Sequence, residues 1–154
     1  MTTKEFGERI VAMQDTLYRV STTILPQLCD REDAVQETIE KAWRKQGSLR
    51  DEGALRAWVI RILVNECYAI LRSRRRETLV DTPPERETGP DAQVNLYRLF
   101  TALDEKYRLP MVLHYVEGYS VEDTARMLRL PRGTVKSRLY RGRLRLKDSL
   151  DMDL

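Results

Sequence analysis

The segment Thr78–Ala92 lacks the apolar periodicity that surrounds it on both sides. It reads TLVDTPPERETGPDA and holds three prolines, one glycine and four acidic residues. Proline fixes φ and removes a backbone donor, so this segment does not extend a helix from either side. Its length and composition favour a flexible linker, and an ordered surface loop is the alternative. The chain of 154 residues is thereby divided into two parts.

Both parts carry apolar residues at helical spacing. The chain is 42% hydrophobic, which is enough for small cores, and its seven glycines and six prolines are too few for a β-rich chain with many turns. The sequence predicts an all-α fold with two small helical domains, at 1–77 and 93–154, joined by a flexible linker at 78–92. No apolar run reaches the length of a membrane span and the N-terminus is not a signal peptide, so we expect a cytoplasmic protein.

Before the linker, the periodicity predicts one helix over about Thr3–Leu25. A second helix, capped by Asp30, runs to about Lys45, and a loop follows at Gln46–Gly53. A third helix begins near Ala54 and ends in a basic cluster. It has a wide apolar face, formed by Leu55, Trp58, Val59, Ile62, Leu63, Cys67, Ile70 and Leu71.

After the linker, two further helices are expected, over Val94–Leu103 and Asp104–Glu117. Pro110 interrupts or kinks the second of them. Gly118 suits its C-terminal end, because glycine readily adopts the left-handed conformation of a helix terminus.

Two short helices joined by a tight turn are predicted within Tyr119–Lys147. Ser120 followed by Asp123 is a weak capping pattern at the start of the first helix. Pro131 is suited to the opening of the second helix, which runs beyond Leu146. The inward positions of this second helix are Val135, Leu139 and Leu146, with Gly142 between them. This arrangement is a helix-turn-helix.

The second helix of this motif is strongly basic. Between Arg126 and Lys147 there are nine Lys and Arg residues and no Asp or Glu, although the net charge of the whole chain is only +3. Such a concentration of positive charge favours binding to phosphate, and a helix of this kind fits the major groove of DNA. The alternative is a solvated basic helix, but the acidic partners typical of a neutral surface helix are missing.

Other chemistry finds little support. Cys29 and Cys67 are expected to be buried free thiols rather than a disulfide. His114 stands among apolar residues and is expected to be structural. The sequence contains no zinc-site spacing, no Gly-rich phosphate loop and no nucleophile elbow, so it gives no reason to expect a cofactor or enzymatic activity.

Four blocks in this order resemble the sigma factors of bacterial RNA polymerase, in particular the small extracytoplasmic-function (ECF) group of the sigma-70 family. They are DREDAVQETIEKAW from Asp30, LRAWVIRILVNECYAILRSRRR from Leu55, LDEKYRLPMVLHYVEGYS from Leu103, and the helix-turn-helix. Each block is weak evidence alone, but the ordered set covers nearly the whole chain and is highly specific. The resemblance implies a σ2 domain, a linker and a σ4 domain.

The resemblance also implies a surface that binds core RNA polymerase, through the β′ clamp helices, with the β flap as a further contact. On the second helix this surface consists of Asp33, Gln36, Glu37, Glu40 and Trp43. Acidic side chains beside an aromatic ring suit a basic partner surface. Without the resemblance, an ordinary solvated helix face is the preferred interpretation.

The third helix resembles the segment that opens and reads the −10 promoter element. Arg61 and Asn65 are four residues apart and polar within an apolar helix, and an asparagine can pair with a base edge. The loop Ser48–Gly53 could help form a base pocket, whereas Trp58 fits the core better. Phosphate contacts are expected from Arg72, Arg74, Arg75 and Arg76.

The helix-turn-helix corresponds to the module that reads the −35 element in the major groove. The residues expected to read bases are Lys136, Ser137, Tyr140 and Arg141. The residues expected to contact phosphate are Arg132, Thr134, Arg138 and Arg143, together with backbone amides near Gly133.

Two positions depart from the family pattern. Arg129 stands in the turn where the family often has glycine, and a positive φ there costs arginine on the order of 1 kcal/mol. Ala69 stands where the family often has an aspartate, so a carboxylate contact near the end of the −10 helix is missing.

The expected function is that of a transcription initiation factor that acts with core RNA polymerase on promoter DNA and is restrained by an anti-sigma factor. The alternative is a stand-alone helix-turn-helix repressor or activator, which needs only the C-terminal half. A third possibility is a sigma-like adaptor without DNA binding, which the basic helix argues against.

Overall fold

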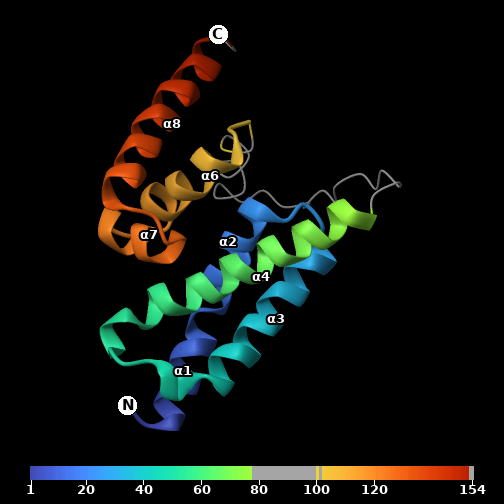
Figure 1. Ribbon diagram of the computed structural model, residues 1–154, viewed down its shortest axis with the longest axis vertical. Helices are drawn as coiled ribbons and strands as arrows, with labels where there is room; N and C mark the ends of the chain where they lie inside the picture. Colours follow the sequence, from blue (N-terminus) through green and yellow to red (C-terminus); the bar gives the residue numbers. More distant parts are fainter. Residues whose placement is uncertain (78–99, 101, 153–154) are drawn as a thin grey trace. The chain divides into compact units, whose positions relative to one another are not determined.

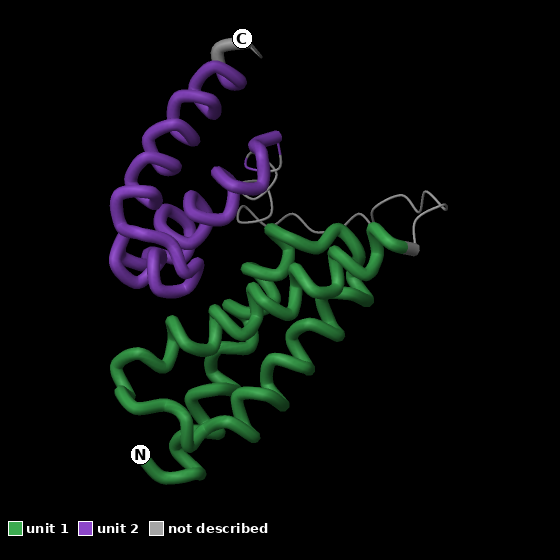
Figure 2. The backbone as a smooth tube through the Cα atoms, viewed as in Figure 1, with its two compact units in different colours: residues 1–85 green, residues 86–154 purple. Residues whose placement is uncertain are grey.

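The computed structural model describes residues 1–77, 100 and 102–152 (Figure 1). The chain forms two compact units, Met1–Glu85 and Arg86–Leu154 (Figure 2). The described residues form helices and turns without a strand, which confirms the all-α prediction. The linker at 78–92 and most of the helix expected at Val94–Leu103 lie outside the described residues. None of the described helices combines the length and the apolar character needed to cross a membrane.

Four α-helices and two short 3₁₀ turns make up the described part of the first unit. In chain order they are α1 (Thr3–Ala12), α2 (Gln14–Ile24), α3 (Leu28–Arg44), the 3₁₀ turns Gln46–Ser48 and Glu52–Ala54, and α4 (Leu55–Glu77). Helix α3 packs along α4, and α2 contacts both. The two long helices run side by side through the unit (Figure 1).

The single helix predicted over Thr3–Leu25 is wrong. The chain bends at Met13, whose backbone N–H donates to the carbonyl of Ile10 at 3.1 Å, one residue closer than an α-helix requires. Met13 itself is buried, and so are Ile10 and Leu17 on either side of it. Because of this bend, the apolar side chains of α1 and α2 both pack into the same core.

The role predicted for Asp30 is also wrong. The N-cap of α3 is Gln27, three residues before Asp30, and its side chain makes no capping hydrogen bond. Asp30 lies in the first turn of α3, where it is 5% exposed and bound to Arg74 of α4. A carboxylate that is removed from water in this way needs a charged partner, and Arg74 supplies it.

The core of the first unit lies between α2, α3 and α4, with Leu17, Val35, Ile60 and Leu63 almost fully buried. Burying one such side chain contributes about 1.5–3 kcal/mol. Trp58 is partly buried, and its ring meets that of Phe6 edge-on at 6.2 Å, which supports its predicted place in the core.

The two thiols differ in their surroundings. Cys67 is fully buried on α4, and burial raises the pKa of its thiol to about 12, so it stays protonated at neutral pH. Cys29 is exposed at the start of α3, contrary to the expectation that both would be buried. Both are free, as predicted.

The described part of the second unit contains α6 (Glu105–Met111), a π-helical turn (Val112–Val116), α7 (Val121–Leu128) and α8 (Arg132–Met152). Pro110 lies inside α6, and the hydrogen-bond pattern changes just after it: the Glu117 N–H donates to the Val112 carbonyl at 2.9 Å. The predicted interruption of this helix is thus present as a π-helical turn. Gly118 follows with φ of 79°, in agreement with its predicted terminal place.

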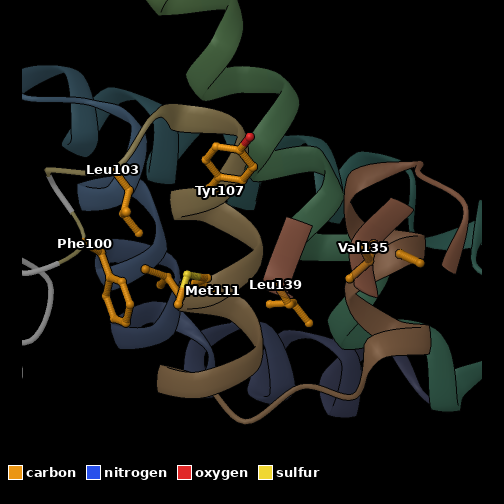
Figure 3. Close-up of a cluster of buried hydrophobic side chains, with 8 residues drawn as sticks. Phe100, Leu103, Tyr107, Met111, Val135 and Leu139 are labelled. Atoms are coloured by element: carbon orange, nitrogen blue, oxygen red, sulfur yellow. The ribbon is translucent and has the colours of Figure 1, made fainter. Parts of the chain in front are cut away.

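One buried apolar cluster holds the second unit together. It joins Tyr107 and Met111 of α6 to Val135 and Leu139 of α8 (Figure 3). The other buried members of the cluster are Phe100, Leu103, Val112 and Ala125. The inward positions predicted for α8 are therefore confirmed at Val135 and Leu139, and Leu146 is partly buried. His114 is half-buried, and its Nδ1 lies 2.7 Å from the Tyr119 carbonyl oxygen, as suits a structural role.

The helix-turn-helix forms where the sequence predicts it. The Ser120 hydroxyl caps α7 by accepting a hydrogen bond from the Asp123 N–H at 3.0 Å. Arg129 ends α7 in the left-handed region, with φ of 54° and ψ of 45°. The Leu130 N–H then donates to the Ala125 carbonyl at 3.0 Å. This hydrogen bond is typical of a helix C-terminus whose left-handed residue is usually a glycine.

Replacing Arg129 with glycine is expected to stabilise the second unit by about 1 kcal/mol, because it removes the left-handed strain of a residue with a Cβ. Gly118→Ala is the matched opposite, since it places a Cβ at a positive φ and should destabilise by a similar amount. Urea denaturation followed by circular dichroism measures both. If Arg129→Gly were less stable than the wild type, the contacts of the arginine side chain would stabilise the unit by more than the backbone strain destabilises it.

Candidate nucleic-acid interface

Helix α8 separates a buried face from a basic exposed face. Val135 and Leu139 point into the core (Figure 3), while the four residues expected to read bases are exposed. They are Lys136, Ser137, Tyr140 and Arg141. Tyr140 is a large aromatic side chain with 57% of its surface exposed. The structure therefore brings these four residues to one accessible side of α8.

The predicted phosphate contacts flank this side. Arg132 pairs with Glu122 at 3.2 Å, but both side chains are about 60% exposed, and such surface pairs contribute only about 0–1 kcal/mol. The pair is weak enough to exchange for a phosphate. Arg143 donates a hydrogen bond to the Tyr115 hydroxyl, and its guanidinium lies 5.9 Å from the Tyr140 ring centroid.

A pocket of about 350 Å³ opens beside the first turns of α8. It is lined by Lys106, Tyr107, Gly133, Thr134, Ser137, Arg138 and Arg141. The pocket is thus lined both by residues expected to read bases and by residues expected to contact phosphate. Lys106 and Tyr107 come from α6 and were missed by the sequence analysis, because only the packing of α6 on α8 brings them there.

Positive charge gathers around Tyr107. The Lys106 ammonium lies 5.0 Å from the centroid of the tyrosine ring, and the Arg145 guanidinium lies 4.9 Å from it. Burial raises the pKa of the Tyr107 hydroxyl, but the hydrogen bond and charge of Lys106, with the charge of Arg145, together lower that pKa below its usual value. The hydroxyl points away from the other labelled core residues (Figure 3).

Helix α4 carries the residues expected at the −10 element. Asn65 is exposed and Arg61 partly buried, one helical turn apart. Arg72, Arg75 and Arg76 are exposed near the end of the helix.

Arg74 differs from its neighbours. Its Nε and Nη2 donate to the two carboxylate oxygens of Asp30, at 3.0 and 2.8 Å. A bidentate pair with a buried carboxylate holds the guanidinium firmly. Arg74 thus joins α4 to α3 in this structure, and its predicted contact with phosphate stays a prediction.

Helix α3 presents an acidic face. Asp33, Gln36 and Glu40 are exposed and Glu37 is partly exposed, at spacings that place them on one side of the helix. Trp43 continues this side with 47% of its surface exposed. Its indole ring packs against α1 near Gly7, where an added Cβ would lie 3.3 Å from the ring.

Two family models match the chain in order. The model "Sigma-70 region 2" matches residues 10–77, and the model "Sigma-70, region 4" matches residues 93–146. The chain is also 30% identical over 141 residues to the ECF RNA polymerase sigma-E factor of Haemophilus influenzae, which covers 79% of this chain and 75% of that protein. The chain belongs to the ECF sigma factors.

Further similarities agree with this assignment. The ECF RNA polymerase sigma factor SigM of Mycobacterium tuberculosis is 37% identical over 122 residues, covering 76% of this chain and 62% of SigM. The match thus spans less than two thirds of SigM. The sigma factor RpoE of Bartonella quintana, solved in complex with the anti-sigma factor NepR, matches with a TM-score of 0.80 and 30% identity, over 98% of this chain and 99% of RpoE.

The two matched regions contain different sets of the predicted site residues. Region 2 takes in only the end of α1 but all of α2, α3 and α4, and it therefore holds both the acidic face and the residues predicted to contact the −10 element. Region 4 contains α6, α7 and the first four turns of α8, including the pocket. The assignment of single residues to polymerase or DNA stays a prediction.

Proposed function

We propose that this sigma factor binds core RNA polymerase, directs it to promoters with two recognition elements and assists melting of the −10 region. It acts without catalytic activity of its own. The observation that supports this most strongly is the ordered pair of sigma regions, each of which contains residues predicted to contact DNA.

In this proposal the acidic face of α3 docks on the β′ clamp helices, and a second contact forms between region 4 and the β flap. Arg61 and Asn65 engage the opened −10 strand, and Arg72, Arg75 and Arg76 hold its phosphates. The α8 residues engage the −35 duplex. Promoter DNA and core polymerase are thus the two partners of the active form.

An anti-sigma factor is the proposed regulator. The support is the similarity to RpoE of Bartonella quintana, whose structure was solved with the anti-sigma factor NepR. Such a protein would restrain this chain by covering the surfaces of region 2 and region 4 that polymerase needs.

A stand-alone repressor or activator is the competing function. Helices α7 and α8 alone would serve it, and a basic helix-turn-helix is common to both functions. It leaves unexplained why α3 exposes Asp33, Gln36, Glu40 and half of Trp43 on one side. The family resemblance assigns this side to polymerase binding, so we prefer that function.

Run-off transcription with purified core polymerase separates the two functions. The sigma factor should produce promoter-specific transcripts from genomic templates, and core polymerase alone should not. If the addition of this chain yields no specific transcript while the chain alone binds duplex sites tightly, the protein is a stand-alone regulator.

Charge reversal on α3 tests the polymerase surface. Asp33→Lys and Glu37→Lys should each reduce co-purification with core polymerase several-fold, because complementary charges both steer and orient the complex. Asp15→Lys is the matched control, since Asp15 is an exposed acid of α2 and lies outside the predicted surface. Full retention by the Asp33 and Glu37 variants would place the interface elsewhere.

A further inference from the structure

The pocket beside α8 has the composition of an anion site. Three of its seven lining residues are cationic, Lys106, Arg138 and Arg141, and none is acidic. Thr134 and Ser137 add hydroxyl groups, and Tyr107 adds a third. Gly133 leaves its backbone open, since a Cβ at this position would meet no atom within 4 Å. These groups are donors that suit the oxygens of a phosphate.

Lys106 is the one cationic residue lining this pocket that does not belong to α8. It is an exposed lysine of α6, outside the helix-turn-helix, yet it lines the same hollow as Arg138 and Arg141. The Lys106 ammonium and the Arg145 guanidinium lie 5.0 and 4.9 Å from the Tyr107 ring centroid, so positive charge is concentrated on this side of α6. Mutual repulsion among these cations is unfavourable in the free protein and is relieved when an anion enters.

We propose that this pocket seats one phosphate of the −35 duplex backbone and that Lys106 of α6 is one of its ligands. The proposal rests on the proposed function, and it adds a DNA contact outside the helix-turn-helix. Ser137 and Arg141 belong both to the pocket and to the expected base-reading side of α8. A phosphate held here therefore fixes the position of α8 along the groove before any base is read.

The alternative role for Lys106 is purely structural, as a cation resting on the Tyr107 ring 5.0 Å away. The two roles predict different salt dependence. A phosphate ligand releases a counterion when DNA binds, whereas a cation that only packs on a ring does not. Each lost phosphate contact reduces the slope of log affinity against log salt concentration by about 0.9.

The test measures binding of reconstituted holoenzyme to promoter duplexes across a salt series. Lys106→Gln should weaken binding by about three- to tenfold at low salt and reduce the salt slope by about 0.9. The loss should be equal for duplexes with different −35 sequences, because phosphate carries no base information. Lys106→Arg keeps the charge and should keep the slope. Lys4→Gln, which removes an exposed lysine of α1, should behave like the wild type.

An unchanged slope in Lys106→Gln would overturn the proposal, and so would a loss confined to certain −35 sequences. Thermal melting of each variant, followed by circular dichroism, separates a folding defect from a lost contact. Lys106→Met, which also removes the charge, takes the place of Lys106→Gln if that variant is unstable. Failure of the proposed function looks different: the wild-type holoenzyme would then show no promoter-specific binding at any salt concentration.

Discussion

Gly142→Ala is expected to lower the free energy of unfolding of the second unit by about 1–3 kcal/mol. A Cβ at position 142 would lie 2.3 Å from Met111 Sδ and 3.1 Å from its Cγ. Met111 is 2% exposed and packed within the α6–α8 cluster, so its side chain has little room to withdraw. The two helices must therefore separate, or Met111 must adopt a strained rotamer.

Gly133→Ala is the matched control for this effect. Gly133 lies in the same helix, and a Cβ there would meet nothing within 4 Å. Alanine should stabilise α8 by about 0.5–1 kcal/mol, because glycine loses more backbone freedom on folding. Chemical denaturation of the two variants gives the comparison. If Gly142→Ala were as stable as Gly133→Ala, the close contact between α6 and α8 would not limit the packing.

Lys136→Ala and Arg141→Ala are expected to weaken recognition of the −35 element by about 1–3 kcal/mol each. Both side chains are exposed on the side of α8 that faces away from Val135 and Leu139. A side chain that bonds a base edge discriminates among bases, so its loss should both weaken binding and relax the preference at one position.

Competition between promoters that differ by single bases in the −35 element provides the measurement, with holoenzyme assembled from each variant. Arg141 also lines the pocket, so its variant distinguishes two roles. Relaxed base preference would identify it as a reader, and an even loss across all sequences would identify it as a phosphate ligand. Unchanged promoter selection in both variants would remove Lys136 and Arg141 from the interface.

Much of the architecture could be predicted from local sequence patterns. The cap at Ser120, the inward positions Val135 and Leu139, and the strain at Arg129 all depend on residues within a turn or two along the chain. Helical periodicity, capping chemistry and backbone sterics act over this range. The same patterns failed at Met13, where buried residues on both sides disguise a bend between two helices.

The sequence by itself determined which segments are helical, where the basic helix lies and which of its sides faces outward. The tertiary structure decided which residues meet across helices. Arg74 reaches Asp30, 44 residues away, and Lys106 joins Arg138 and Arg141 in one pocket. Helical periodicity specifies the faces of one helix, but the partner of each face depends on how the side chains of two helices interlock. Gly142 shows this most clearly, because only the approach of Met111 makes its missing side chain necessary.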